Sequence, residues 1–200
     1  GFNANSASVI WKTPIPAPGF SSPIVWSNRI FLSGGDATKR EVFCFDVADG
    51  KLLWRRAIEN VPGAPAKLPE IPEATGCAAP TMATDGRCAF VMFVSGELAA
   101  LNFDGSVAWA KHLGVPKNMY GHASSLAIAP GKLIVQLDQD DGAPGGSKFW
   151  YSFNVWSPRL LRSTRNRMRR APACLSSRQL KLQAVKVLPA PVAIWISDRG

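Results

Sequence analysis

Hydrophobic and polar residues alternate in short stretches along the first 155 residues of the chain, and no sustained helical period interrupts them. Residues 42–47 and 98–103 show the pattern best, and each stretch is followed by a glycine turn and a second short apolar stretch. Alternation over a few residues is typical of β-strands that bury one face. The sequence therefore predicts an all-β protein built from short strands.

A unit of strand, turn and tryptophan recurs along the chain. Gly50 precedes Trp54 by four residues, and Gly105 precedes Trp109 by the same interval. Residues 151–155 begin a third copy, and the stretch around Trp11 ends an earlier one. Stretches with two-residue turns, typical of hairpins, precede the copies at residues 22–32, 79–91 and 124–135. Each repeat thus predicts four strands in meander order.

The spacing of the tryptophans suits propeller blades. Trp11 and Trp54 are 43 residues apart, as expected for a blade of roughly 40–50 residues. Trp54 and Trp109 are 55 residues apart, and we assign the 12 additional residues to a proline-rich inserted loop at 61–73. A tryptophan in every blade offers a large ring and an N–H to the neighbouring blade. We expect these tryptophans to be structural, with ligand stacking as the alternative.

The repeated pattern resembles the PQQ-like (quinoprotein-like) propeller repeat over about residues 9–155. Residues 19–26, 83–86 and 120–125 extend the resemblance to secreted bacterial propeller proteins. The resemblance implies an extracytoplasmic (periplasmic or secreted) propeller of about seven or eight blades. This chain would then be a β-propeller fragment of about three four-stranded blades. The best-known functional relative of this kind is an outer-membrane assembly lipoprotein whose propeller is a protein-interaction scaffold.

The cysteines bear on whether the chain is an enzyme. Quinone-dependent alcohol dehydrogenases of the resembled family carry two adjacent cysteines near the cofactor, and no two cysteines are adjacent here. The spacing of the four cysteines matches no zinc or haem motif either, and Cys44 and Cys88 lie in apolar strand patterns typical of small buried side chains. We expect a non-catalytic scaffold that binds a protein or a small ligand, without a cofactor or metal. The alternative is a domain of a quinone- or metal-dependent oxidoreductase.

The densest polar cluster lies around the start of the third blade. Its candidate ligand-binding residues are Tyr120, His122, Ser124, Ser125, Asp138 and Gln139. The first four enter the innermost strand and the last two leave its hairpin partner, so both groups reach the loop surface where propellers usually bind ligands. His122 could act as a base or a metal ligand. The alternative is that His122 and the serines satisfy backbone groups.

The net charge of +9 belongs to the end of the sequence. Residues 151–200 contain ten Lys or Arg residues and one acid, so residues 1–150 are neutral overall. No apolar run reaches the roughly 18 residues that a membrane-spanning helix needs. The basic character therefore describes one segment and not the surface of the predicted propeller.

Residues 156–200 depart from the repeat. Pro158 and Arg162 stand where the repeat calls for glycine and tryptophan. We divide the chain into a partial propeller at 1–155 and an irregular, off-pattern basic tail at 156–200. Three interpretations of the tail, which is expected to be frameshifted or disordered, stay open: a frameshifted or truncated sequence of non-native residues, a genuine basic extension that binds an acidic partner or nucleic acid, and a degenerate blade. Nucleic-acid binding is disfavoured because residues 162–170 contain no aromatic side chain.

Overall fold

The computed structural model describes residues 9–65, 67–140, 147–154 and 182–186, and these residues form three four-stranded antiparallel sheets without a helix. The first sheet contains β1 (Ile24–Trp26), β2 (Arg29–Gly35), β3 (Arg40–Asp46) and β4 (Leu52–Ala57). The second contains β5 (Ala83–Thr84), β6 (Cys88–Met92), β7 (Glu97–Asn102) and β8 (Val107–His112). The third contains β9 (Ala127–Ala129), β10 (Lys132–Gln139), β11 (Ser147–Asn154) and β12 (Leu182–Lys186).

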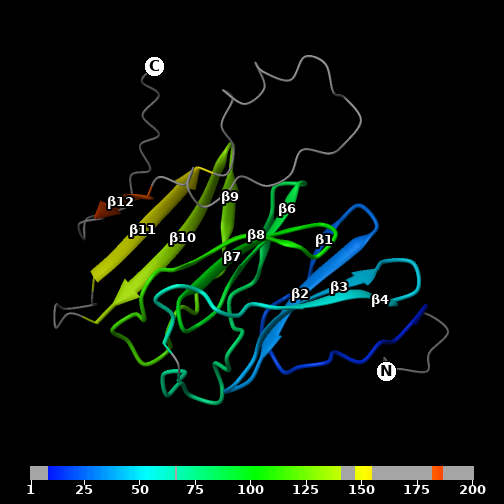
Figure 1. Cartoon of the computed structure of the whole chain (residues 1–200), viewed down its shortest axis with the longest axis horizontal. Helices are drawn as coiled ribbons and strands as arrows, with labels where there is room; N and C mark the ends of the chain where they lie inside the picture. Colours follow the sequence, from blue (N-terminus) through cyan, green and yellow to red (C-terminus); the bar gives the residue numbers. More distant parts are fainter. Residues whose placement is uncertain (1–8, 66, 141–146, 155–181, 187–200) are drawn as a thin grey trace.

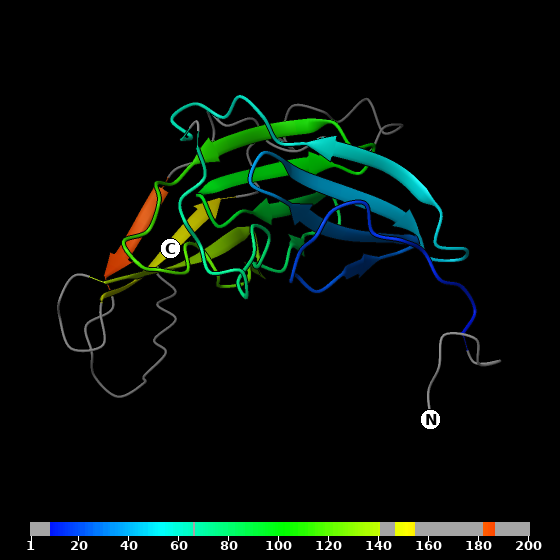
Figure 2. The ribbon, with the colours of Figure 1, turned by 90° about the horizontal axis from the view of Figure 1, so that it is seen from below.

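The three sheets follow one another in chain order and pack face to face (Figures 1 and 2). In each sheet the strands pair in the order in which they occur in the chain, as in the blades of a propeller. The predicted all-β propeller fold is therefore confirmed, with three blades in the part of the chain that the structure describes.

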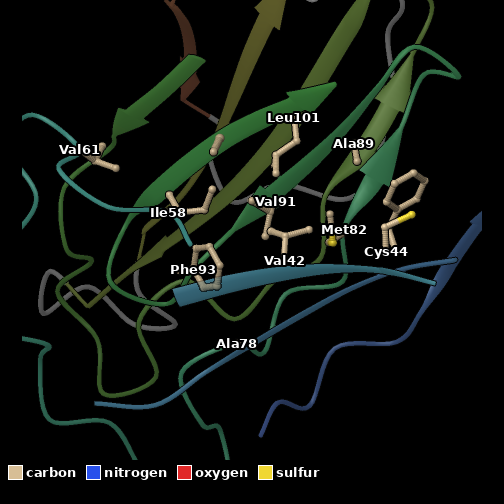
Figure 3. Close-up of a cluster of buried hydrophobic side chains, with 12 residues drawn as sticks. Val42, Cys44, Ile58, Val61, Ala78, Met82, Ala89, Val91, Phe93 and Leu101 are labelled. Atoms are coloured by element: carbon tan, nitrogen blue, oxygen red, sulfur yellow. The ribbon is translucent and has the colours of Figure 1, made fainter. Parts of the chain in front are cut away.

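Apolar side chains of the middle sheet alternate between the two neighbouring sheets. Ala89 and Val91 on β6 join Val42 and Cys44 of β3 in a core between the first and second sheets (Figure 3). The intervening residue Phe90 joins a second core, whose members from the third sheet include Leu133 and Val135. Strands β6 and β7 are therefore buried on both faces, because each face meets another sheet.

The repeated tryptophan connects each blade to the next. The indole Nε1 of Trp54 donates a hydrogen bond of 3.0 Å to the carbonyl of Phe103, and its ring lies over Gly105. Trp11 makes the same contacts one blade earlier, with a bond of 2.9 Å to Val47 O and its ring over Gly50. We call this arrangement the tryptophan clasp. It explains why each of these turns carries a glycine, since a side chain there would collide with the tryptophan ring of the preceding repeat.

The two long connections and two of the hairpin loops lie at one end of the sheets, which we call the loop end. It comprises residues 36–39, 58–82, 93–96 and 113–126, whereas the opposite turn end carries the short hairpin turns. Residues 58–82 connect β4 to β5 without a strand, so the predicted insertion at 61–73 lies outside the ladders. Val61 and Leu68 of this connection are nevertheless buried, which shows that the insertion packs onto the blades.

The third sheet differs from the sequence-based expectation at its outer edge. Pro158 and Arg162 lie outside the described residues, so the expected boundary at residue 155 stays a prediction. The outer strand is instead β12, drawn from residues 182–186 and paired antiparallel to β11. Part of the sequence predicted to be off-pattern thus occupies the place of a fourth strand. Alternating Leu182, Ala184 and Lys186 gave no recognisable repeat, because the glycine and tryptophan are missing there.

Candidate functional site

The candidate residues of the third blade lie on the connection between β8 and β9 and on β10. They differ widely in exposure: Tyr120 is 51% exposed, whereas His122 is 3% exposed. The connection turns sharply between them at Gly121, whose φ is +66°. A β-carbon at Gly121 would lie 2.5 Å from the carbonyl oxygen of Val94, so this turn packs directly on the β6–β7 loop.

His122 is held by backbone groups on both sides. Its amide donates to Val94 O at 3.0 Å, and its ring Nε2 lies 3.1 Å from Gly114 O. The pKa of His122 is lowered to about 4, mainly by burial and in part by the neighbouring His112, against the raising effect of the Gly114 hydrogen bond. The imidazole is therefore neutral at pH 7 and fixes the loop. The sequence left this structural role open beside a catalytic or metal-binding one.

Ser124 and Asp138 are brought together as the sequence analysis expected of one surface. The Ser124 hydroxyl donates to Asp138 Oδ2 at 3.4 Å, and Gln136 Nε2 donates to both oxygens of the same carboxylate at 3.0 Å. Asn118 Nδ2 donates to the Asp138 carbonyl at 2.6 Å. These bonds tie the β8–β9 connection to β10.

The remaining two candidates also bind backbone. Gln139 Oε1 accepts a bond of 2.6 Å from the amide of Lys117, and Ser125 Oγ accepts one of 3.2 Å from the amide of Thr81. The Ser125 contact joins the third blade to the strand entering the second. Together the polar candidates act as a brace that fixes the conformation of residues 113–126, and Tyr120 and Ser125 are the exposed members of the set.

Apart from Tyr120, the large exposed apolar side chains near the loop end were missed by the sequence analysis. Val115, Met119 and Tyr120 of the braced connection are 41%, 63% and 51% exposed, and Phe20 before β1 is 63% exposed. Phe20 also lines a pocket of about 520 Å³ between the inserted loop and the β2–β3 turn. Apolar residues outside strand patterns were the available signal, but sequence alone does not show whether a loop turns them inward.

The apolar pocket beside Phe20 is formed largely by the insertion. Leu68, Ile71 and Pro72 of the insertion form one wall of the pocket, and Cys77 also lines it as a free thiol whose pKa is raised by burial. Cys44 is free and fully buried, whereas Cys88 is buried and disulfide-bonded.

Among the residues the structure describes, no group of three or more His, Cys, Asp or Glu side chains could hold a metal ion. The same residues contain no helix capable of crossing a membrane.

A family model described as the outer membrane protein assembly factor BamB matches residues 1–136. The solved structure of BamB from Moraxella catarrhalis is similar with a TM-score of 0.48 and 16% identity, covering 77% of this chain and 42% of that protein. Among curated proteins, none matches the chain.

Two dehydrogenases of known structure are also similar. The quinohemoprotein alcohol dehydrogenase ADHIIG from Pseudomonas putida HK5 has a TM-score of 0.51 and 18% identity, covering 72% of this chain and 20% of that protein. A europium-containing methanol dehydrogenase has a TM-score of 0.46 and 18% identity, covering 67% and 23%. At such identities the likeness to ADHIIG shows the fold alone. This chain spans less than half the length of each of these proteins.

Proposed function

The chain belongs to the family of the outer membrane protein assembly factor BamB, and we propose that it is a non-catalytic propeller scaffold that binds a protein partner outside the cytoplasm. The loop end provides the binding surface. The family name supports a partner from outer-membrane protein assembly.

The exposure of apolar side chains on a braced loop carries this proposal. Met119 and Tyr120 project from residues 113–126, while His122 and Ser124 are engaged in holding that segment in place. An apolar side chain on a preorganised loop loses little conformational entropy when a partner covers it. Tyrosine and methionine are also enriched at protein interfaces. The arrangement therefore supports recognition of a partner more than chemistry at His122.

Site-specific photo-cross-linking in the producing cells tests the proposal. A photoreactive amino acid in place of Tyr120 is expected to cross-link a defined component of outer-membrane protein assembly. The same amino acid in place of Lys51, which is exposed at the turn end, is the matched control and should not. Met119→Ala in the Tyr120-labelled chain should reduce the yield several-fold.

Two outcomes would contradict the scaffold. Equal cross-linking from the two ends would remove the loop end as the binding surface. Reduction of an electron acceptor by the purified chain with an alcohol and added quinone would instead support the oxidoreductase alternative. Fractionation of the same cells tests the location, because a cytoplasmic chain is incompatible with the proposal.

A further inference from the structure

A second, polar pocket lies on the loop end at the junction of the first two blades. Its volume is about 230 Å³. Arg40 at the start of β3 lines it from the first blade, and Glu97 at the start of β7 lines it from the second. Asn60 and the apolar side chains of the β4–β5 connection complete the lining, namely Ile58, Val61, Ala64 and Pro65. The backbone of Ile58 donates to the Arg40 carbonyl at 2.8 Å, which fixes this wall to β3.

Glu97 is fully buried and only partly satisfied. Its Oε2 accepts a short hydrogen bond from the Ser95 hydroxyl. Its Oε1 lies 3.1 Å from Arg40 Nε in an ion pair, but the N–H is not aligned with it as a hydrogen bond. Both atoms are buried without a hydrogen-bond partner among the described residues. Buried polar atoms are almost always paired, so Glu97 Oε1 and Arg40 Nε are poised to bond a group that enters this pocket.

The chemistry of the missing group follows from the two atoms. Oε1 of Glu97 requires a donor and Nε of Arg40 requires an acceptor. The two side chains neutralise each other, so the pocket offers a charged ligand no net attraction that would offset its loss of hydration. A primary carboxamide carries an N–H donor and a carbonyl acceptor side by side without net charge. The pocket volume is several times the roughly 30 Å³ that a water molecule occupies. The pocket can therefore hold a carboxamide together with a short carbon chain.

We propose that the Arg40–Glu97 pocket is a binding site for a primary carboxamide, either a free small amide or the side chain of a glutamine or asparagine on a docking partner. The inference goes beyond the proposed function in naming a second site on the loop end. With a partner's side chain as the ligand it rests on that function, and with a free amide it does not.

Titration of the full chain with propionamide tests the site without any partner. The Nε–H resonance of Arg40, assigned by its loss in Arg40→Lys, should shift and saturate at millimolar amide. Propionate and 1-propanol match the probe in size and should bind at least about tenfold more weakly. No saturable shift with propionamide, or equal shifts with propanol, would overturn the proposal and indicate that water fills the pocket.

Variants separate the pocket from effects on the fold. Glu97→Gln should weaken propionamide binding at least about tenfold, because it removes the carboxylate acceptor. Ala64→Leu should abolish binding by filling the pocket without touching the ion pair. Lys39→Ala is the control, since Lys39 is exposed beside Arg40 but does not line the pocket. Unchanged affinity in Ala64→Leu would overturn the assignment even if Glu97→Gln failed to fold.

Peptides distinguish the two sources of the amide. The peptide acetyl-Gly-Gln-Gly N-methylamide, whose only primary carboxamide is the glutamine side chain, should bind at least about tenfold more tightly than acetyl-Gly-Glu-Gly N-methylamide if a partner's side chain is the ligand. Equal affinity of the glutamine peptide and propionamide would favour a free small amide. Weaker binding of both peptides than of propionamide would exclude a docked side chain. None of these results depends on the cross-linking experiment.

Discussion

His122 shows how a single buried residue couples the loop end to pH. Its pKa falls from the ordinary 6.5 to about 4, mainly through burial and in part through His112, although the Gly114 hydrogen bond, Glu97 and Asp138 act to raise it. Since the folded-state pKa lies below the unfolded one, protonation favours unfolding. The stability that neutral His122 contributes is present above about pH 6.5 and is lost as the pH falls towards 4.

Urea unfolding at pH 7 and pH 4.5 measures this coupling. The wild-type chain should lose about 2–3 kcal/mol between these values through His122. The variant His122→Gln keeps a polar side chain that does not titrate. Between pH 7 and pH 4.5 its unfolding free energy should therefore fall by about 2–3 kcal/mol less than that of the wild type. Identical pH dependence in the two proteins would show that His122 is not held neutral.

Alanine substitutions at Gly105 and Gly114 separate the contribution of the tryptophan clasp to stability from the cost of a positive φ. Gly105 and Gly114 have nearly the same φ, +87° and +89°. A β-carbon at Gly105 would lie 2.8 Å from the Trp54 ring, whereas one at Gly114 would meet nothing within 4 Å. Both alanine variants should lose about 1 kcal/mol from the positive φ. Gly105→Ala should lose about 1–3 kcal/mol more in urea unfolding, through overpacking of the ring.

Equal losses in the two glycine variants would mean that the clasp adds nothing to stability. The sequence predicted Gly105 and Trp109 as members of one repeat, but the ring that covers Gly105 is Trp54 of the preceding blade. A repeat shows which residues recur and not which copy each contacts. For the same reason Arg40 and Glu97, 57 residues apart, gave no sequence signal of a shared pocket.

Strands and hairpins were the best-predicted part of the chain. Asp85-Gly86 and Pro130-Gly131 fix the hairpin turns locally, and the strands flank them at β5–β6 and β9–β10. The residues of a turn also fix the register of the two strands that it joins, so this register can be predicted from the sequence. The connections were predicted only as loops, because their conformation depends on contacts such as Thr81 with Ser125 from another blade. The candidate site lies on these connections, so its exposure could not be foreseen.

The three interpretations of residues 156–200 can be distinguished by experiment. Tyr151 and Ser152 on β11 pair with β12, so residues 155–181 connect two neighbouring strands. Limited trypsin digestion should cut first among the arginines at 162–170, where the repeat pattern is broken. Arg55 and Arg56 lie in β4 and are the internal control, because paired strands resist proteolysis. First cleavage at the β4 arginines would favour a blade that extends through the tail.

Across the described part of the molecule, two hydrophobic cores lie between the three sheets, so each sheet depends on a neighbouring sheet for its stability. Phe90 and Val91, adjacent on β6, belong to different cores, so the middle blade is stabilised from both sides. The outward face of the first blade is covered differently, by the extended segment before β1. Pro18 O accepts a bond of 2.7 Å from the Gly35 amide, and the carbonyls of Ala17 and Pro18 lie against Gly34. Trp11 fastens the start of this cover.

Trp11→Ala tests whether that cover stabilises the stack of blades. Removal of the ring and of its hydrogen bond to Val47 O should lower the unfolding free energy by about 2 kcal/mol. It should also increase concentration-dependent association in light scattering, because a loosened segment leaves more of the apolar sheet face open to other molecules. Ile10→Ala is the matched control: Ile10 is 90% exposed, so its truncation should change stability by less than about 0.5 kcal/mol. Equal effects of the two substitutions would show that the first blade is stable without the clasp, and that the repeated tryptophan matters only between complete blades.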